Sequence, residues 1–395
     1  MSNHIICNKM DALKTIFKMI LGFAIGALAG LLIAGIGLVC FTDMTFPEFI
    51  SKLLSVKMGE SMLAAGVAVL AFFVSIAVLI PLHEAGHLVC GLLSGYKFVS
   101  FRIFNLTIIK IDGKLRVKRY GVAGTSGQCL LTPPDLPLDE IPTAWYNFGG
   151  VMANLIAALL AIPLIFMVEH PLAGEIVVVF LFTDVLMILM NGVPMKISGA
   201  PNDGYNMLSL RKQPVSKRAF VESLRANALL QNGIRPKDMP EEWFALPEEI
   251  NYKNQLEISI PLMAISRLMD ELRFGEALQQ LESLYEHKQE ILGLFVKEIE
   301  CELVFLRLVA GNNMEGARAL LDKNLKQYIK IYSKIMSSKE RIRCSIALLM
   351  DNDRAKAEEI YNNLRARQSE YLLQGEVKSD LAIMEAVLFP GKKNL

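Results

Sequence analysis

The chain has 395 residues, more than one typical domain, and its composition combines two characters. Hydrophobic residues make up 53% of it and charged residues 21%, which indicates an apolar part and a polar part within one chain. A net charge of +1 gives no long-range field for nucleic acid, so we expect no nucleic-acid partner. The six cysteines contain no CxxC pair, which argues against a secreted disulfide framework.

Four stretches are apolar over the roughly 20 residues that a helix needs to cross a bilayer. They cover residues 20–41, 61–82, 145–167 and 175–193. The first lacks a convincing cleavage site, so we expect it to remain as a span. It carries Gly22, Gly26 and Gly30, whose spacing predicts close packing on another helix or on a second copy of the chain. The alternative is that these glycines reflect only the glycine content of membrane helices.

The positions of lysine and arginine set the expected orientation, because short cytoplasmic loops are enriched in them. Seven basic residues lie within residues 97–119, and five lie within residues 196–218. We therefore expect both segments and both termini to be cytoplasmic. The protein would be a multi-pass protein of a cell membrane, in the simplest case the bacterial plasma membrane.

The second apolar stretch is expected to end in an HExxH motif, His83-Glu84-Ala85-Gly86-His87. On a helix His83 and His87 share one face, so their imidazoles can bind one metal ion. Glu84 would take a proton from a metal-bound water, whose pKa zinc lowers to about 7. Because ionisable residues inside a membrane helix are costly, a metal site is favoured over ordinary polar residues at a helix end.

A catalytic zinc usually has three protein ligands, so a third must come from elsewhere in the chain. Asp203 follows the fourth apolar stretch, on the side of the membrane to which the two histidines belong. Asp184, inside that stretch, is the alternative ligand. A polar contact between helices is the favoured interpretation of Asp184, because it lies deeper in the membrane than Asn191.

Together these residues resemble the site-2 protease family of intramembrane metalloproteases. That family pairs HExxH with an NxxPxxxxDG pattern on a later helix, and Asn191, Pro194, Asp203 and Gly204 match the pattern in order. Eight residues separate Pro194 from Asp203 where the pattern has four, so this sequence departs from it by an insertion. The resemblance covers residues 61–206. It implies that Asp203 is the third zinc ligand of an enzyme that cuts peptide bonds of membrane-embedded proteins or peptides.

The third apolar stretch opens with residues 147–154, Asn-Phe-Gly-Gly-Val-Met-Ala-Asn, which look like the glycine and asparagine motif of that family's central helix. The family's asparagine lies near the active site. We therefore expect Asn154 to contact the substrate backbone or the developing oxyanion, with a hydrogen bond between helices as the alternative. Asn191 is expected to bind substrate as well.

Residues 101–120 predict a cytoplasmic β-hairpin with Asp112-Gly113 at its turn. One edge of it is expected to pair with an unwound substrate, or the hairpin rests on anionic headgroups. After a proline-marked linker, Ala277, Ala317 and Ala357 lie 40 residues apart in segments that begin helices. This spacing predicts helical hairpins resembling tetratricopeptide repeats, which could bind a cytoplasmic protein.

The sequence thus predicts an α-helical, multi-pass membrane protein of about four spans, with a small β-hairpin and a C-terminal all-α domain. Its expected parts are the tail, first span and outer segment at 1–60, the protease core at 61–207, the linker at 208–250 and the helical domain at 251–395. The expected enzyme is a zinc metalloendopeptidase with Zn²⁺ on His83, His87 and Asp203 and with Glu84 as general base. Its expected partners are a transmembrane substrate and the lipid bilayer. Competing hypotheses are a catalytically degenerate scaffold and a zinc transporter.

Overall fold

The computed structural model describes residues 45, 47–48, 51, 58–111, 113–121, 126–197 and 200–391. The chain forms two compact units, Met1–Leu70 and Ala71–Leu395, and the candidate site lies in the second. The expected first span, residues 20–41, lies outside the described residues, together with its glycines Gly22, Gly26 and Gly30.

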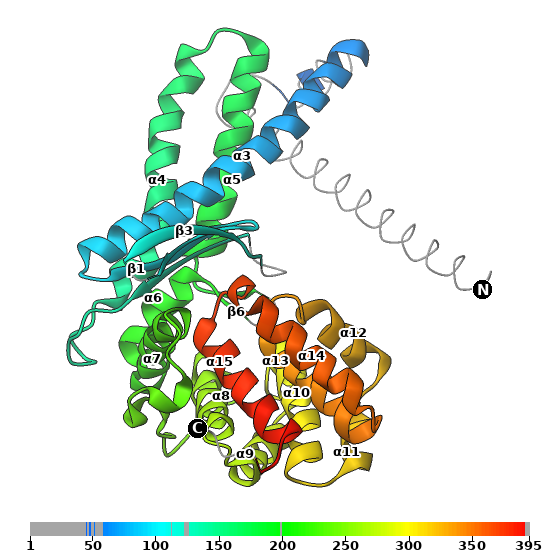
Figure 1. Cartoon of the computed structure of the whole chain (residues 1–395). Coiled ribbons are helices and arrows are strands. Elements are labelled where there is room, and N and C mark those ends of the chain that lie inside the picture. Colours follow the sequence, from blue (N-terminus) through cyan, green and yellow to red (C-terminus); the bar gives the residue numbers. More distant parts are fainter. Residues whose placement is uncertain are drawn as a thin grey trace. The chain divides into compact units, whose positions relative to one another are not determined.

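Three helices in the described part of the chain are long and apolar enough to cross a membrane, which indicates a membrane protein. They are α3 (Met58–Leu93), α4 (Thr143–Met167) and α5 (Pro171–Gly192), and α4 and α5 run side by side (Figure 1). They confirm the second, third and fourth predicted stretches. The expected end of the second stretch at the HExxH motif is wrong. Apolar residues follow His87, so α3 continues to Leu93 and the motif lies inside the helix.

The segment after α3 forms a four-stranded antiparallel sheet rather than a single hairpin. Its strands are β1 (Lys97–Ile103), β2 (Leu106–Ile111), β3 (Lys114–Arg119) and β4 (Gly127–Thr132), in the order β3-β2-β1-β4. The predicted turn is confirmed at Gly113, whose φ of 77° places it in the left-handed region between β2 and β3. The prediction missed β1 and β4, because neither shows a clear alternation of apolar and polar residues.

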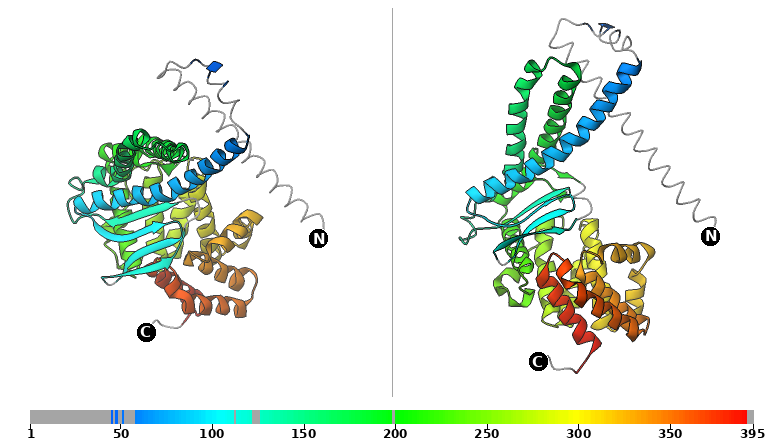
Figure 2. Two further views of the ribbon diagram at one scale, coloured as in Figure 1. Left: turned by 90° about the horizontal axis from the view of Figure 1, so that it is seen from above. Right: turned by 45° about the horizontal axis from the view of Figure 1, so that its top comes forward.

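Helices cover both faces of this sheet around β1 and β4. Helix α3 crosses one face (Figure 2), where a Cβ at Gly91 would lie 2.1 Å from the Leu131 side chain of β4. Helix α7 (Pro214–Gln231) packs on β4 and reaches β1, where Gln231 Nε2 donates to Ser100 Oγ at 3.3 Å. The sheet therefore connects the apolar helices to the polar C-terminal region.

The chain between α5 and the C-terminal region is largely ordered into short elements. A two-stranded ladder of β5 (Lys196–Ile197) and β6 (Ala200–Pro201) leads into α6 (Asp203–Lys212). Residues 208–250, expected as a linker, contain the end of α6, the whole of α7 and two 3₁₀ turns. These turns are η1 (Pro236–Asp238) and η2 (Glu241–Phe244).

The remaining described chain is a helical region, as the sequence predicts. Its helices are α8 (Gln255–Asp270), α9 (Phe274–Glu286), α10 (Gly293–Val309), α11 (Met314–Leu320), α12 (Lys323–Tyr332), α13 (Ser337–Ser345), α14 (Arg354–Arg367) and α15 (Gln374–Leu388). A π-helical turn η3 (Ile346–Met350) extends α13, and a 3₁₀ turn η4 (Gln368–Glu370) extends α14.

A structural period of 40 residues runs through this region. Helices α9, α11 and α14 begin at the three segments that the sequence singles out, and their alanines Ala277, Ala317 and Ala357 are all 0% exposed. Two residues before each helix start, the backbone takes positive φ values of 61°, 43° and 52°, at Leu272, Asn312 and Asn352. Because this conformation is unfavourable for residues other than glycine, its recurrence confirms that the segments repeat. The name tetratricopeptide repeat stays a prediction.

Candidate metal centre

Three side chains from two distant parts of the chain meet at the end of α5. His83 and His87 come from α3, and Asp203 is the first residue of α6. The Nε2 atoms of the two histidines are 3.2 Å apart, and Asp203 Oδ2 lies 3.0 Å from that of His83 and 3.4 Å from that of His87. Within the described residues these three form the group of histidine, cysteine and acidic side chains that could hold a metal ion.

Each imidazole is held by a hydrogen bond on its other nitrogen. His87 Nδ1 lies 2.7 Å from the carbonyl oxygen of Tyr146, which can only accept, so this nitrogen must carry a proton. His83 Nδ1 lies 2.7 Å from Oδ1 of Asn154. Asn154 Nδ2 in turn donates to Asp184 Oδ1 at 2.7 Å, so the amide oxygen faces His83 and again accepts. Both neutral rings therefore present an unprotonated Nε2.

This arrangement favours a cation between the three donor atoms. Without a cation, both Nε2 atoms would need a proton to donate to Asp203, so both rings would be imidazolium ions in contact with each other. Both histidines are also less than 10% exposed. Two buried like charges at this separation repel strongly. A divalent cation satisfies all three lone pairs instead, and second partners on Nδ1 are the usual surroundings of metal-binding histidines.

The separations of the donor atoms are close to those around a small tetrahedral ion such as zinc. Zinc binds imidazole nitrogen and carboxylate oxygen at about 2.0–2.2 Å in tetrahedral geometry, which puts neighbouring donor atoms roughly 3.3–3.5 Å apart. The observed separations are 3.0–3.4 Å. Two nitrogens and one oxygen are also a donor set that zinc prefers.

Glycines of α4 make room for the donor atoms. A Cβ at Gly150 would lie 2.5 Å from His83 Nε2 and 2.6 Å from His87 Nε2, so any larger residue would fill the space that the donors face. Gly149 and Gly86 face each other, and a Cβ on either would come within 2.4 Å of the other's carbonyl oxygen. These glycines therefore allow α3 and α4 to approach closely at the site.

The inserted residues before Asp203 fold back on themselves. Strands β5 and β6 pair, and Asn202 N donates to Met195 O at 3.1 Å. The chain therefore returns to Met195, shortly after the end of α5. Asn202 is 8% exposed and its Nδ2 donates to the carbonyl oxygens of Met190 and Val193, both at 2.6 Å. Its Oδ1 accepts from Tyr205 N and caps α6. The insertion thus leaves Asp203 next to the end of α5.

A close contact of backbones fixes α6 at this position. A Cβ at Gly204 would lie 2.1 Å from the carbonyl oxygen of Gly192, so the start of α6 packs directly on the end of α5. This contact and the Asn202 cap together direct the Asp203 carboxylate at the two histidines.

Asp203 is ionised at neutral pH. Burial alone would raise the pKa of its carboxyl group. Positive charge facing the carboxylate, whether on protonated His83 and His87 or on a cation held between neutral rings, outweighs burial and lowers this pKa, to about 2 with the protonated rings. An ionised carboxylate is the form that binds a metal ion.

Asp184 is not a member of the donor group but supports it through Asn154. It is 0% exposed, and its Oδ1 holds the Asn154 amide that orients His83. The favoured interpretation, a polar contact between helices, is confirmed. Asn154 is also 0% exposed, and its expected contact with substrate stays a prediction. Asn191 Nδ2 donates to Met187 O within α5, so its role in substrate binding stays a prediction too.

Glu84 lies beside the donor group without belonging to it. Its carboxylate packs on the first residue of β4, because a Cβ at Gly127 would lie 2.4 Å from Glu84 Oε1. The acid is therefore placed between the candidate metal ligands of α3 and an edge strand of the sheet.

Comparisons of the chain with models of protein families, with curated proteins and with solved structures found no match.

Proposed function

We propose that this protein is a zinc-dependent endopeptidase that hydrolyses peptide bonds of membrane-embedded proteins or peptides. The observation that carries the proposal is the convergence of His83, His87 and Asp203 beside Glu84, on an apolar helix long enough to cross a bilayer. The motifs on α3 and around Asp203, which resemble those of site-2 proteases, point to the same chemistry.

When bound, a zinc ion supplies Lewis acidity and makes water nucleophilic at neutral pH. Glu84 takes the proton of the attacking water and then gives it to the amine that leaves. Asn154 and the Tyr146 carbonyl keep the imidazoles in the tautomer that presents Nε2. A largely buried site limits access of bulk water, so charges formed during hydrolysis are stabilised mainly by these fixed groups.

An extended substrate would reach Glu84 along β4. A membrane helix hides its amides in its own hydrogen bonds, so it must be unwound before it is cut, and pairing with a sheet edge holds it extended. β3 and β4 are the edge strands, and β4 starts against Glu84. We therefore assign the expected pairing to β4 rather than to the hairpin of β2 and β3.

The proposal is tested by comparing small membrane proteins and released peptides, by mass spectrometry, in cells that carry the native chain or Glu84→Gln. We expect uncut species to accumulate in the variant. Glu175→Gln, which removes an acid at the other end of α5, should behave as the native chain. Identical profiles for all three chains under several growth conditions would instead favour the scaffold hypothesis, in which the helical domain recruits a cytoplasmic partner.

A further inference from the structure

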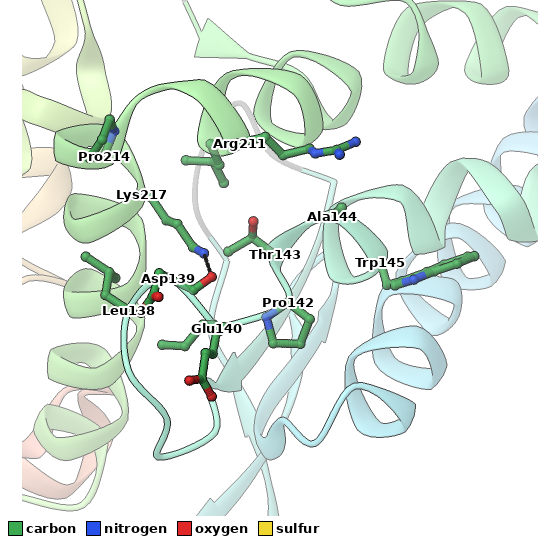
Figure 3. Close-up of a pocket in the computed structure, with 12 residues that line it drawn as sticks. Leu138, Asp139, Glu140, Pro142, Thr143, Ala144, Trp145, Arg211, Pro214 and Lys217 are labelled. Carbon is green, nitrogen blue, oxygen red and sulfur yellow. Dashed lines mark hydrogen bonds between the residues drawn. The ribbon is translucent and has the colours of Figure 1, made fainter.

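A cavity of about 610 Å³ opens at the start of α4, on the side of α6 and α7. It lies outside the metal centre and none of the roles assigned above uses it. The polar and aromatic residues that line it are Asp139, Glu140, Thr143, Trp145, Arg211 and Lys217 (Figure 3).

The first turn of α4 carries partial positive charge at this cavity, although its first N–H, that of Thr143, already donates to the Ile141 carbonyl oxygen at 3.1 Å. No side chain caps the helix, and its first turn contains no acidic residue. The first N–H groups of a helix have no partner within it, and the helix dipole adds partial positive charge there. Such an end attracts phosphate or carboxylate groups.

The hydroxyl of Thr143 is a further donor that faces the cavity. Thr143 is 4% exposed, yet within the described part of the chain its hydroxyl forms no hydrogen bond. Figure 3 shows this oxygen pointing into the space beside Lys217. The hydroxyl is open to the cavity rather than sealed from solvent, so an acceptor on a ligand would replace water as its partner.

Basic and acidic groups both line the cavity. Lys217 Nζ donates to the Asp139 carbonyl oxygen at 2.9 Å, which leaves further N–H groups for a ligand, and Arg211 is exposed at the end of α6. Asp139 and Glu140 add carboxylates, and Figure 3 shows that of Glu140 pointing away from Thr143. The cavity therefore suits a ligand that carries a phosphate and an amine at opposite ends.

The position of Trp145 points to a lipid as the source of that ligand. It stands in the first turn of a helix long enough to cross a membrane, and it is 58% exposed. Tryptophan at such a position marks the boundary between hydrocarbon and headgroups. The cavity next to it then lies at the level of the lipid phosphates.

We propose that this cavity binds the headgroup of a zwitterionic phospholipid with a primary amine, of the phosphoethanolamine type. The phosphate is held by the first turn of α4, Thr143, Lys217 and Arg211, and the amine lies toward Asp139 and Glu140. The proposal depends on the membrane location and not on the protease activity.

Native mass spectrometry of the full-length protein in detergent tests the proposal with four probes added separately. They are short-chain phosphatidylethanolamine, phosphatidylcholine, phosphatidylglycerol and inorganic phosphate. We expect phosphatidylethanolamine to bind most tightly, because phosphatidylcholine cannot donate to the carboxylates and phosphatidylglycerol lacks the amine. Lys217→Gln and Thr143→Val, which keep side-chain size, should each weaken its binding about tenfold.

Lys212→Gln is the matched control, since Lys212 adjoins Arg211 in α6 but does not line the cavity. It should leave lipid binding unchanged. Equal binding by the native chain, Lys217→Gln and Thr143→Val would overturn the proposal. Tighter binding of phosphatidylglycerol would overturn the assigned headgroup, and binding of inorganic phosphate as tight as that of the lipid would identify a free anion as the ligand instead.

Discussion

At the scale of single residues, Asn154 determines which ring nitrogen of His83 carries the proton. An amide side chain can present either its oxygen or its nitrogen, and the direction here is set by the Asp184 carboxylate, which can only accept. The motif around Asn154 marks it in the sequence as a functional residue. Its role could not be read there, because Asp184 lies 30 residues away on another helix.

Replacing Asp184 by Asn should weaken metal binding. The new amide could donate to Asn154 and turn its NH₂ group toward His83, which would then lose the acceptor that fixes its tautomer. Loss of such an outer partner costs about 10–100-fold in metal affinity. Competition with a chromogenic chelator measures it. Thr183→Val is the control, since the hydroxyl of the buried Thr183 forms its hydrogen bond within α5. An unchanged metal affinity in Asp184→Asn would refute the role of Asp184 in orienting Asn154.

Gly150 has an equally local role that the sequence shows only as part of a glycine pair. Gly150→Ala should abolish metal uptake, because the added methyl group would lie 2.5 Å from His83 Nε2. Gly174→Ala is the matched control, since a Cβ there meets nothing within 4 Å. Metal content of the purified proteins checks this, and full occupancy in Gly150→Ala would mean that the metal lies elsewhere.

At the scale of elements, the insertion before Asp203 could not be interpreted from the sequence. The ladder of β5 and β6 is too short to give a strand pattern, and its effect appears only where Asn202 meets Met195. One signal was available. Asn202 stands directly before Asp203-Gly204-Tyr205, and asparagine there is typical of a helix N-cap. The motif residues indicate which side chains could bind the metal, whereas the short distances between those side chains depend on contacts between elements.

Helix α15 carries an acid whose protonation stabilises the C-terminal region. Burial and the neighbouring Asp380 carboxylate raise the pKa of Glu376 to about 8, with Glu298 and Glu302 of α10 acting in the same direction and Lys339 of α13 against it. The folded protein therefore keeps a proton that the unfolded chain releases near pH 4.5. This contribution to stability is complete at low pH and is lost as the pH rises toward about 8.

We expect the apparent melting temperature of the protein in detergent to fall between pH 6 and pH 9. The accompanying loss of free energy of unfolding has an upper limit of about 1.4 kcal/mol per pH unit. The melting temperature of Glu376→Gln should fall less steeply with pH, because an amide does not titrate. Glu315→Gln, at an exposed position of α11, should keep the native slope. Parallel curves for all three chains would contradict the role of Glu376.

At the scale of the whole molecule, hydropathy predicts the apolar helices well, because each has to satisfy its own backbone in lipid. Their side chains agree with a lipid environment: Leu159 is 66% exposed and Phe166 is 85% exposed in α4, and Phe73 is 62% exposed in α3. The sheet was predicted less well, because pairing of β1 with β4 joins segments separated by a hairpin. Orientation in the membrane stays a prediction from the basic residues.

Labelling of single cysteines tests that orientation. The cysteines in the described part of the chain are all buried, so only Cys7 and Cys40 are changed to serine to give the background for labelling. We expect His170→Cys, between α4 and α5, to react with a membrane-impermeant maleimide in intact cells, and Glu315→Cys to react only after lysis. The reverse pattern would place the helical region outside the cell and contradict the cytoplasmic assignment.

The central claim is that His83, His87 and Asp203 hold one metal ion that Glu84 uses without binding it. The most direct test is the zinc content per chain of purified native protein, Glu84→Gln and Asp203→Ala, measured by inductively coupled plasma mass spectrometry. We predict about one zinc per chain in the native protein and in Glu84→Gln, and a large loss in Asp203→Ala. Equal zinc in Asp203→Ala and the native protein, or loss of zinc in Glu84→Gln, would contradict the assigned site.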